Sequence, residues 1–187
     1  MSSTTVQIPG YVVGTWAIDP VHSEVSFVVR HMMVSKVRGR FDKFEGTLVT
    51  AADPLQSSVT AKVDLSSINT GQEQRDAHIR SADFFEVEKY PEMTFVSTGI
   101  KQGEEGFFLE GDLTIKDVTK AVAFELEVTG FGPDAYGGTR CGFSATTQID
   151  RHDYHVDFNG PIPGVPGGVA VSANVTITLE IEGVLQA

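Results

Sequence analysis

Cysteine is almost absent from this sequence of 187 residues, which contains only Cys141. One cysteine cannot form an intrachain disulfide, so the fold must be held together by its core and its hydrogen bonds. Cys141 lies within an apolar alternating run with no local base to activate it, so we expect a buried structural thiol rather than a nucleophile. The folded monomer should therefore be insensitive to mild reductant.

Basic residues are also few, since 14 Lys and Arg stand against 25 Asp and Glu and give a formal net charge of −11. Nucleic acids and anionic membranes are polyanions, so this balance argues against broad docking on either. The sequence has no run of Lys and Arg that would indicate a local basic patch. No stretch approaches the ~18 continuous apolar residues of a membrane span. We expect no nucleic-acid partner and no stable membrane insertion.

The first 14 residues have neither a basic start nor an apolar run long enough for a signal peptide. We therefore expect a cytoplasmic protein, with residues 1–14 as a leading segment and residues 15–184 as a single domain.

Signatures of enzymes are missing as well. The segment Gly142-Phe143-Ser144-Ala145 does not complete a nucleophile elbow, which needs glycine on both sides of the serine. No glycine-rich phosphate loop of either nucleotide-binding type is present. We therefore expect a protein that is not an enzyme and carries no cofactor.

The sequence is rich in segments in which apolar and polar residues alternate, a pattern typical of half-buried strands. Eight such runs are present, at about 25–29, 37–50, 59–65, 93–97, 107–115, 122–128, 141–149 and 171–181. Eight apolar faces need a common interior, and closing the sheet removes its exposed edges. The pattern predicts an all-β fold, an eight-stranded antiparallel up-and-down barrel. Such a barrel can be filled by side chains or can hold one small ligand.

One segment breaks the strand pattern. Residues 70–73 read Thr-Gly-Gln-Glu, which fits a capping box and predicts a short helix from about Gln72 to about Arg80. The Tyr90-Pro91 pair should end helical structure, because a residue before proline disfavours the α region. We expect this helical insert to lie across one end of the barrel. Its charged residues Arg75, Asp76 and His78 would either pair with one another or brace the helix against the barrel.

Phenylalanine is frequent, with 12 residues, many of them at same-face positions of the runs. The alternation predicts an interior cavity lined by Phe27, Phe41, Phe95, Phe107, Phe124, Phe143 and Ile177. The loop from Gly160 to Gly168 also contains apolar residues, Ile162 and Val165, which would either cover a pocket mouth or pack within the loop itself.

The densest polar cluster runs from Arg151 to Asp157 and allows three interpretations. Arg151, with His152 and His155, could meet a phosphate or carbonyl head group of a ligand. His152 and His155 could instead bind a metal together with Asp157 if the loop folds back. The third interpretation is a solvated loop with local hydrogen bonds. No metal-ligand motif is complete here, so we expect no resident metal.

The order of these motifs resembles the YceI-like family of polyisoprenoid-binding proteins over roughly residues 15 to 184. The matching segments are Trp-Ala-Ile-Asp-Pro-Val-His-Ser at 16–23, Arg-Asp-x-His-Ile-Arg-Ser at 75–81, Tyr-Pro-x-x-x-Phe at 90–95, Gly-Asp-Leu-Thr-Ile-Lys at 111–116 and Ile-Asp-Arg at 149–151. The resemblance implies a lipocalin-like barrel with a long tunnel for an isoprenoid chain, and it is compatible with a homodimer.

We therefore expect a binding protein that carries, stores or sequesters one long apolar lipid, either a prenyl phosphate or an isoprenoid quinone. The alternative is a metal-dependent enzyme or metal protein that uses His152 and His155.

Overall fold

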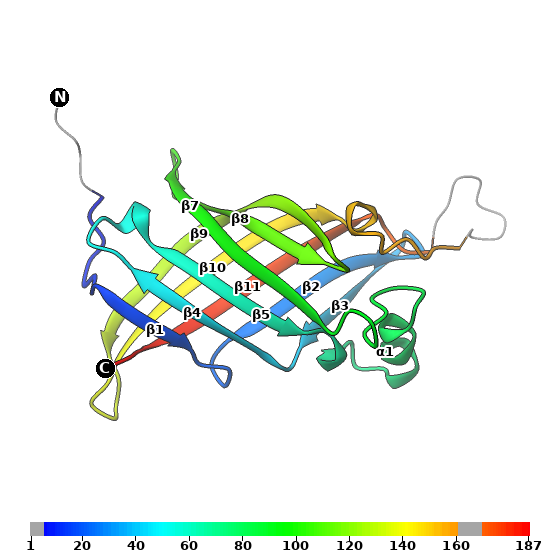
Figure 1. Cartoon of the computed structure of the whole chain (residues 1–187), viewed down its shortest axis with the longest axis horizontal. Helices are drawn as coiled ribbons and strands as arrows, with labels where there is room; N and C mark the ends of the chain where they lie inside the picture. The colour runs from blue at the N-terminus through cyan, green and yellow to red at the C-terminus, as the bar shows by residue number, and fades with distance from the viewer. Residues whose placement is uncertain (1–5, 161–169) are drawn as a thin grey trace.

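Antiparallel strands form a single sheet that closes into a barrel (Figure 1). The computed structural model describes residues 6–160 and 170–187. Its strands are β1 (Gly14–Ile18), β2 (Glu24–His31), β3 (Ser35–Phe41), β4 (Phe44–Thr50), β5 (Ser58–Asp64), β6 (Ile68–Asn69), β7 (Glu92–Gln102), β8 (Phe107–Ile115), β9 (Val118–Pro133), β10 (Thr139–Asp150) and β11 (Asn174–Leu185). Its helical elements are α1 (Glu73–Arg80) and the 3-10 turns η1 (Pro54–Gln56), η2 (Leu65–Ser67) and η3 (Arg151–Tyr154). None of the described helices combines the length and the apolar character needed to cross a bilayer.

Eight strand positions make up the barrel wall, because two pairs of labelled strands each continue one another. β1 and β2 are halves of one position that breaks at residues 19–23, and β3 and β4 are halves of another that breaks at residues 42–43. The two-residue β6 lies beside β3 and adds no position. The predicted eight-stranded antiparallel barrel with a short helical insert is therefore confirmed. The loop residues Ile162 and Val165 lie outside the described residues.

Strand β11 closes the barrel, because its two halves pair with different strands. Near its C-terminal end Leu185 is paired with Trp16 of β1, and nearer its start Ile177 is paired with Phe27 of β2. Along its other edge β11 runs antiparallel to β10 over its whole length. Closure in this way leaves β11 no free edge that could pair with another chain.

Alternation places the expected apolar faces inside the barrel, with two register shifts that the sequence did not indicate. On β7 the pairing shifts after Ser97, and the inward face changes from Phe95 to Ile100. A second shift, in the pairing of β9 with β10, changes the inward face of β9 from Val128 to Phe131. Each shift adds one residue to a strand, so the parity of the inward residues changes beyond it.

The helical insert forms as predicted, but the predicted capping residue was wrong. The N-cap of α1 is Gln72, whose side-chain oxygen accepts a hydrogen bond from the backbone N–H of Arg75. Thr70 instead donates through its backbone N–H and its hydroxyl to the buried carboxylate of Asp76. The carboxylate of Glu73 lies 2.7 Å from Arg80 Nη2, so Asp76 and not Glu73 binds Thr70 where the chain enters the helix.

A small core fills the end of the barrel near β1 and includes the single cysteine. Trp16, Leu48 and Cys141 are buried together there, and the indole N–H of Trp16 donates to the hydroxyl of Thr50 at 2.9 Å. Burial raises the pKa of the Cys141 thiol to about 11. The thiol therefore stays protonated at neutral pH, as expected for a structural cysteine.

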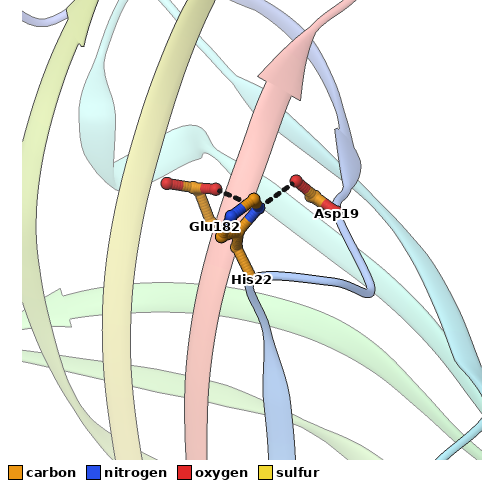
Figure 2. Close-up of side chains that lie close together, drawn as sticks. All are labelled: Asp19, His22 and Glu182. Atoms are coloured by element: carbon orange, nitrogen blue, oxygen red, sulfur yellow. Dashed lines mark hydrogen bonds and ion pairs between the residues drawn. The ribbon is translucent and has the colours of Figure 1, made fainter. Parts of the chain in front are cut away.

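The break between β1 and β2 is held by a network of charged side chains. Figure 2 shows His22 between the carboxylates of Asp19 and Glu182, and its Nδ1 lies 2.7 Å from Asp19 Oδ2. Arg140 reaches the same network, with Nη1 at 2.7 Å from Asp19 Oδ2 and 3.0 Å from Glu182 Oε2. Hydrogen bonds from His22 and then from Arg140 hold the pKa of the Asp19 carboxyl well below its ordinary value of 3.8.

This network makes the stability of the fold sensitive to acid. A carboxyl whose pKa is lower in the folded state stabilises that state above its ordinary pKa, and the stabilisation is lost as pH falls below it. We expect the free energy of unfolding of the wild type to fall below about pH 4, and Asp19→Asn to lose much of that dependence. Urea unfolding at a series of pH values measures this. The matched control is Asp112→Asn, an exposed carboxyl on β8, and an equal flattening of its pH profile would contradict the assignment.

Candidate ligand-binding site

The interior of the barrel contains a cavity in two parts, which we call the narrow lobe and the wide lobe. The narrow lobe, of about 150 Å³, is lined almost wholly by apolar atoms, including those of Ala61, Phe95, Leu109, Phe124, Ala145 and Leu179. The wide lobe, of about 510 Å³, lies at the barrel end that carries α1 (Figure 1). The volume of the wide lobe by itself lies in the range of about 300–1,000 Å³ that is usual for small-molecule sites.

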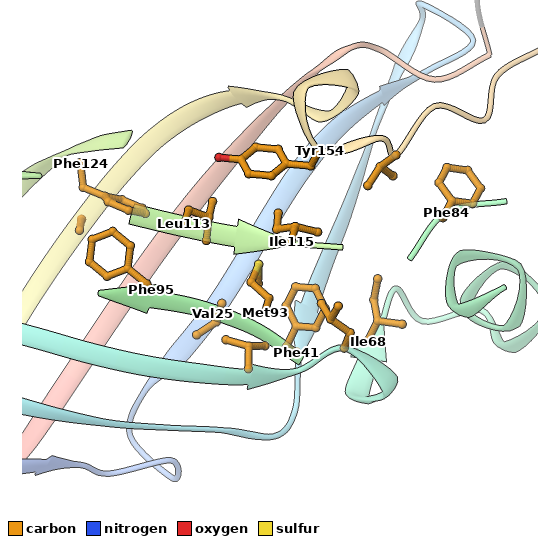
Figure 3. Packing of buried hydrophobic residues seen from close by; sticks show 14 of the residues in the cluster. Val25, Phe41, Ile68, Phe84, Met93, Phe95, Leu113, Ile115, Phe124 and Tyr154 are labelled. Carbon is orange, nitrogen blue, oxygen red and sulfur yellow. The ribbon is translucent and has the colours of Figure 1, made fainter. Parts of the chain in front are cut away.

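Three side chains line both lobes, namely Val25, Met93 and Ile177. Figure 3 shows Val25 and Met93 within the apolar cluster of the barrel, between Phe95 on one side and Phe41 on the other. Methionine is unbranched and has three rotatable bonds, so Met93 can change its shape at little cost. The two lobes therefore meet at side chains that they share, and Met93 is the most adaptable of the three.

The structure places all seven apolar residues of the predicted lining on the cavity. The narrow lobe receives Phe95, Phe107, Phe124 and Phe143, the wide lobe receives Phe27 and Phe41, and Ile177 lines both. Their positions follow from the alternation of the strands, because Phe95 and Phe124 precede the register shifts of β7 and β9 and the other five residues lie on other strands. Their contact with a ligand remains a prediction.

Two of the phenylalanine rings approach the barrel wall closely because a glycine faces each of them. A Cβ built on Gly39 would lie 2.3 Å from the ring of Phe27, and one built on Gly111 would lie 2.4 Å from the ring of Phe95. Such distances are far shorter than any van der Waals contact, so only glycine permits these ring positions. The two glycines thereby keep the rings out of the centre of the cavity.

Polar residues gather where the wide lobe meets the surface. Arg30 and His31 come from the end of β2, and Gln72, Arg75 and His78 come from α1 and its N-cap. Most of these groups are already engaged on the protein. Arg75 donates to the hydroxyl and carbonyl of Thr70, and His78 Nε2 lies 2.8 Å from Asp83. The rim is thus polar, whereas the lumen behind it is apolar.

Arg151, which we predicted to meet a ligand head group, binds the backbone through its guanidinium, and its contact with a ligand remains a prediction. The residue is 5 % exposed, and its guanidinium donates to four carbonyl oxygens, those of Val156, Phe158, Val171 and Ser172, at 2.7 to 3.3 Å. Burial lowers the pKa of the Arg151 guanidinium, and the neighbouring carboxylates of Asp157 and Asp150 act in the opposite direction. Although Arg151 borders the wide lobe, its N–H groups hold the chain after η3 against the chain that enters β11.

His152 and His155 lie outside the linings of both lobes. His152 Nδ1 is 3.0 Å from Asp157, and both side chains are exposed. His155 ends η3 in the left-handed conformation, with φ of 59°, and its carbonyl accepts a hydrogen bond from Lys116. The structure does not bring His155 to His152 and Asp157, so these three form no metal site.

Among the described residues, Asp19, His22 and Glu182 are the one group of three potential metal ligands that converge, with their ligand atoms within 4.8 Å of one another. The guanidinium of Arg140 already lies between the two carboxylates of this group. A bound cation would face that positive charge, so we interpret the group as an ion-pair network.

Tyr154 is a polar lining residue that the sequence did not reveal. Its side chain is 1 % exposed, borders the wide lobe, and has a hydroxyl with no hydrogen-bond partner among the described residues. Figure 3 shows its ring among the apolar side chains, with the hydroxyl pointing back along the barrel and away from η3. Burial, with a smaller effect from Asp153, raises the pKa of Tyr154 to about 12, so the hydroxyl is neutral and can donate.

Comparison with known proteins agrees with this architecture. Residues 16–183 match the family described as the YceI-like domain. The chain belongs to the YceI-like family. Curated relatives include a UPF0312 protein of Pseudomonas putida strain W619, 36 % identical over 167 residues that cover 88 % of this chain and 82 % of the relative. Protein YceI of Escherichia coli O157:H7 is 35 % identical, with 88 % and 83 % covered.

Solved structures with this fold include other YceI-like proteins and a binding domain. BcnA of Burkholderia cenocepacia superposes with a TM-score of 0.76 at 24 % identity, covering 88 % of this chain and 98 % of that one. A polyisoprenoid-binding domain from Saccharophagus degradans, implicated in plant cell wall breakdown, superposes with a TM-score of 0.69 at 18 % identity, covering 94 % and 100 %. At these identities the likeness establishes the shared barrel fold.

The backbone contacts of Arg151 predict a large loss of stability when the residue is removed. We expect Arg151→Ala to lower the free energy of unfolding by at least about 3 kcal/mol, because each hydrogen bond to a charged group contributes about 1.5–3 kcal/mol. Arg151→Lys should restore little, since one ammonium group cannot reach four carbonyls. Chemical denaturation measures both variants, with the exposed Arg38→Ala as control. An unchanged stability of Arg151→Ala would show that the residue is not structural.

Proposed function

We propose that this YceI-like protein binds one long apolar lipid, a polyisoprenoid, along the barrel interior. The observation that carries the proposal is the pair of apolar lobes joined at Met93 in a closed barrel. An elongated hydrocarbon chain suits this shape, because its far end can occupy the narrow lobe while its other end stays near the polar rim. The fold shared with a polyisoprenoid-binding domain supports the same class of ligand.

Binding rather than catalysis fits the chemistry of the lining. The narrow lobe offers almost no polar atom, so a substrate there would meet no acid, base or nucleophile. Most of the polar groups at the rim are held by partners on the protein, as in the pairs Arg75–Thr70 and His78–Asp83. The protein would then carry, store or sequester the lipid unchanged.

The hydrocarbon tail should supply most of the affinity. Burial of apolar surface yields about 25 cal/mol per Å², so a tail that buries on the order of 400 Å² gains roughly 10 kcal/mol before the costs of association. One charge-assisted hydrogen bond at the head contributes only about 1.5–3 kcal/mol. Affinity should therefore follow the length of the chain and tolerate different head groups, so that both prenyl phosphates and isoprenoid quinones can bind.

Filling the narrow lobe should remove this dependence on chain length. Ala145 is buried on the wall of the narrow lobe, and Ala145→Phe would occupy its space. We expect the wild type to bind solanesol, a long prenyl alcohol, much more tightly than farnesol, a short one. Ala145→Phe should bind the two alike, because only the wide lobe remains. Calorimetric titration measures the affinities, and mass spectrometry of organic extracts should find long-chain prenyl lipid in the wild type and not in Ala145→Phe.

The matched control is Thr146→Phe, which places the same ring one residue further along β10 on the exposed face. It should keep the preference of the wild type for the long chain. Since an extra ring can destabilise a packed interior by about 1–3 kcal/mol, Ala61→Phe in the same lobe provides a second variant, and both are checked for folding by thermal melting. An affinity of the wild type that does not depend on chain length would refute a tunnel for a polyisoprenoid.

Tyr154 should contribute a hydrogen bond to ligands that carry a polar end. We expect Tyr154→Phe to weaken the binding of a prenyl alcohol by about 1 kcal/mol, close to fivefold in affinity. The binding of an isoprenoid hydrocarbon such as squalene should not change. Stability without ligand should not fall, since the hydroxyl has no partner among the described residues. Parallel titrations of the two ligands test this. Equal losses for both would assign the effect to packing rather than to the hydroxyl.

A further inference from the structure

Three apolar side chains stand exposed at the tip of the hairpin that joins β2 and β3. Met32, Met33 and Val34 are 40 %, 57 % and 83 % exposed. Two methionines and a valine side by side at a loop tip place apolar surface where turns usually carry polar residues or glycine. A cluster of this kind indicates a partner that offers apolar surroundings.

The backbone of the same turn is strained. Met32 and Met33 have φ of 51° and 62°, and the N–H of Val34 donates to the carbonyl of His31 at 3.1 Å. Two consecutive residues at positive φ within such a hydrogen bond are the features of a type I′ turn, in which Asn-Gly is strongly preferred. Methionine in the left-handed region costs about 1–2 kcal/mol. Local backbone preference therefore does not explain why methionine occupies these two positions. We interpret the exposed side chains as a contact surface.

A row of cations lies on the outer face of the hairpin behind this tip. Arg30 of β2 is paired in register with Lys36 of β3, and Arg38 follows on the same exposed face. Like charges directly opposite each other on neighbouring strands are destabilising. Within the described residues these three cations take part in no ion pair, whereas Arg40 further along β3 pairs with Asp42 at 2.9 Å. An external polyanion would relieve this repulsion.

The hairpin also borders the opening of the wide lobe. Arg30, His31 and Val37 line that lobe from the hairpin, and Gln74 and His78 line it from α1. Figure 1 shows the end of β2, the start of β3 and α1 at the same end of the barrel. A surface in contact with the hairpin tip would thus lie next to the entrance of the cavity.

We infer that the β2–β3 hairpin docks reversibly on a membrane surface that contains anionic lipid. Met32, Met33 and Val34 enter the interfacial region, while Arg30, Lys36 and Arg38 contact the acidic head groups. Apolar side chains beside Lys and Arg match the two requirements of interfacial binding. A second copy of the same hairpin would bring cations against cations, so self-association through this face is disfavoured. The docking surface stands independently of the ligand, although it would bring the cavity entrance to the bilayer.

Flotation of the full-length protein with vesicles tests this inference. The vesicles consist of phosphatidylcholine alone or of two parts phosphatidylcholine and one part phosphatidylglycerol, without added prenyl lipid. We expect binding to the mixed vesicles only, weakening as salt is added. Replacing all three cations by glutamine, as Arg30→Gln, Lys36→Gln and Arg38→Gln, should lower the affinity on the order of 100-fold, because each basic residue near an anionic surface contributes about fivefold.

A second variant separates docking from folding. Met32→Asn with Met33→Gly installs the sequence that a type I′ turn prefers, so its melting temperature should equal or exceed that of the wild type. Its affinity for the mixed vesicles should nevertheless fall roughly tenfold or more, because the apolar tip is gone. The charge control is Lys101→Gln with Lys120→Gln, two exposed lysines on β7 and β9, which should bind like the wild type.

Three results would overturn the inference: no binding of the wild type to the mixed vesicles, equal binding by the hairpin variants, or an equal loss in the lysine control. Dimerisation that the hairpin variants abolish, seen by sedimentation without vesicles, would also overturn it and assign the tip to a protein contact. The titrations of prenyl alcohols use the wild type and the Ala145 and Tyr154 variants without vesicles, so docking and ligand binding can fail separately.

Discussion

Pairing of β11 with both halves of one broken strand is the interaction on which the rest of the structure depends. The ladder from β11 to β1 and β2 closes the sheet, and closure separates an apolar interior from an acidic surface. The break at residues 19–23 interrupts that ladder, and the Asp19–Arg140 pair spans it together with Glu182. A buried or half-buried ion pair of this kind can favour the correct pairing of strands as much as it adds net stability. The two lobes exist only because this closure is maintained.

The barrel and its inward residues could be predicted because alternation is a local property of the chain. Phe95 and Phe124 face the lumen since each lies at an even spacing from its apolar neighbours, and no register shift intervenes. The shifts on β7 and β9 depend on pairing with another strand, so they left no mark that a single sequence could reveal. The helix was predictable for the same local reason, but its cap was not, because Asp76 competed successfully for Thr70.

The polar features were harder to predict, because a charged residue is defined by what surrounds it in space. Arg151 reads in the sequence as a candidate for an anionic ligand, yet four backbone carbonyls from two separate segments use its N–H groups. The cations of the hairpin were missed for the opposite reason. Lys36 and Arg38 alternate with Val37 and so form no run in the sequence, but alternation on a strand places them side by side on one face.

The rings of Phe27 and Phe95 lean on Gly39 and Gly111, residues that do not themselves line the cavity as side chains. A single methyl group at either glycine would push a ring towards the axis of the barrel. The width of the barrel interior therefore depends on Gly39 and Gly111, two residues of the wall that do not line the cavity. Two barrels with the same phenylalanines could thus have interiors of different width, and a comparison restricted to lining residues would not detect the difference.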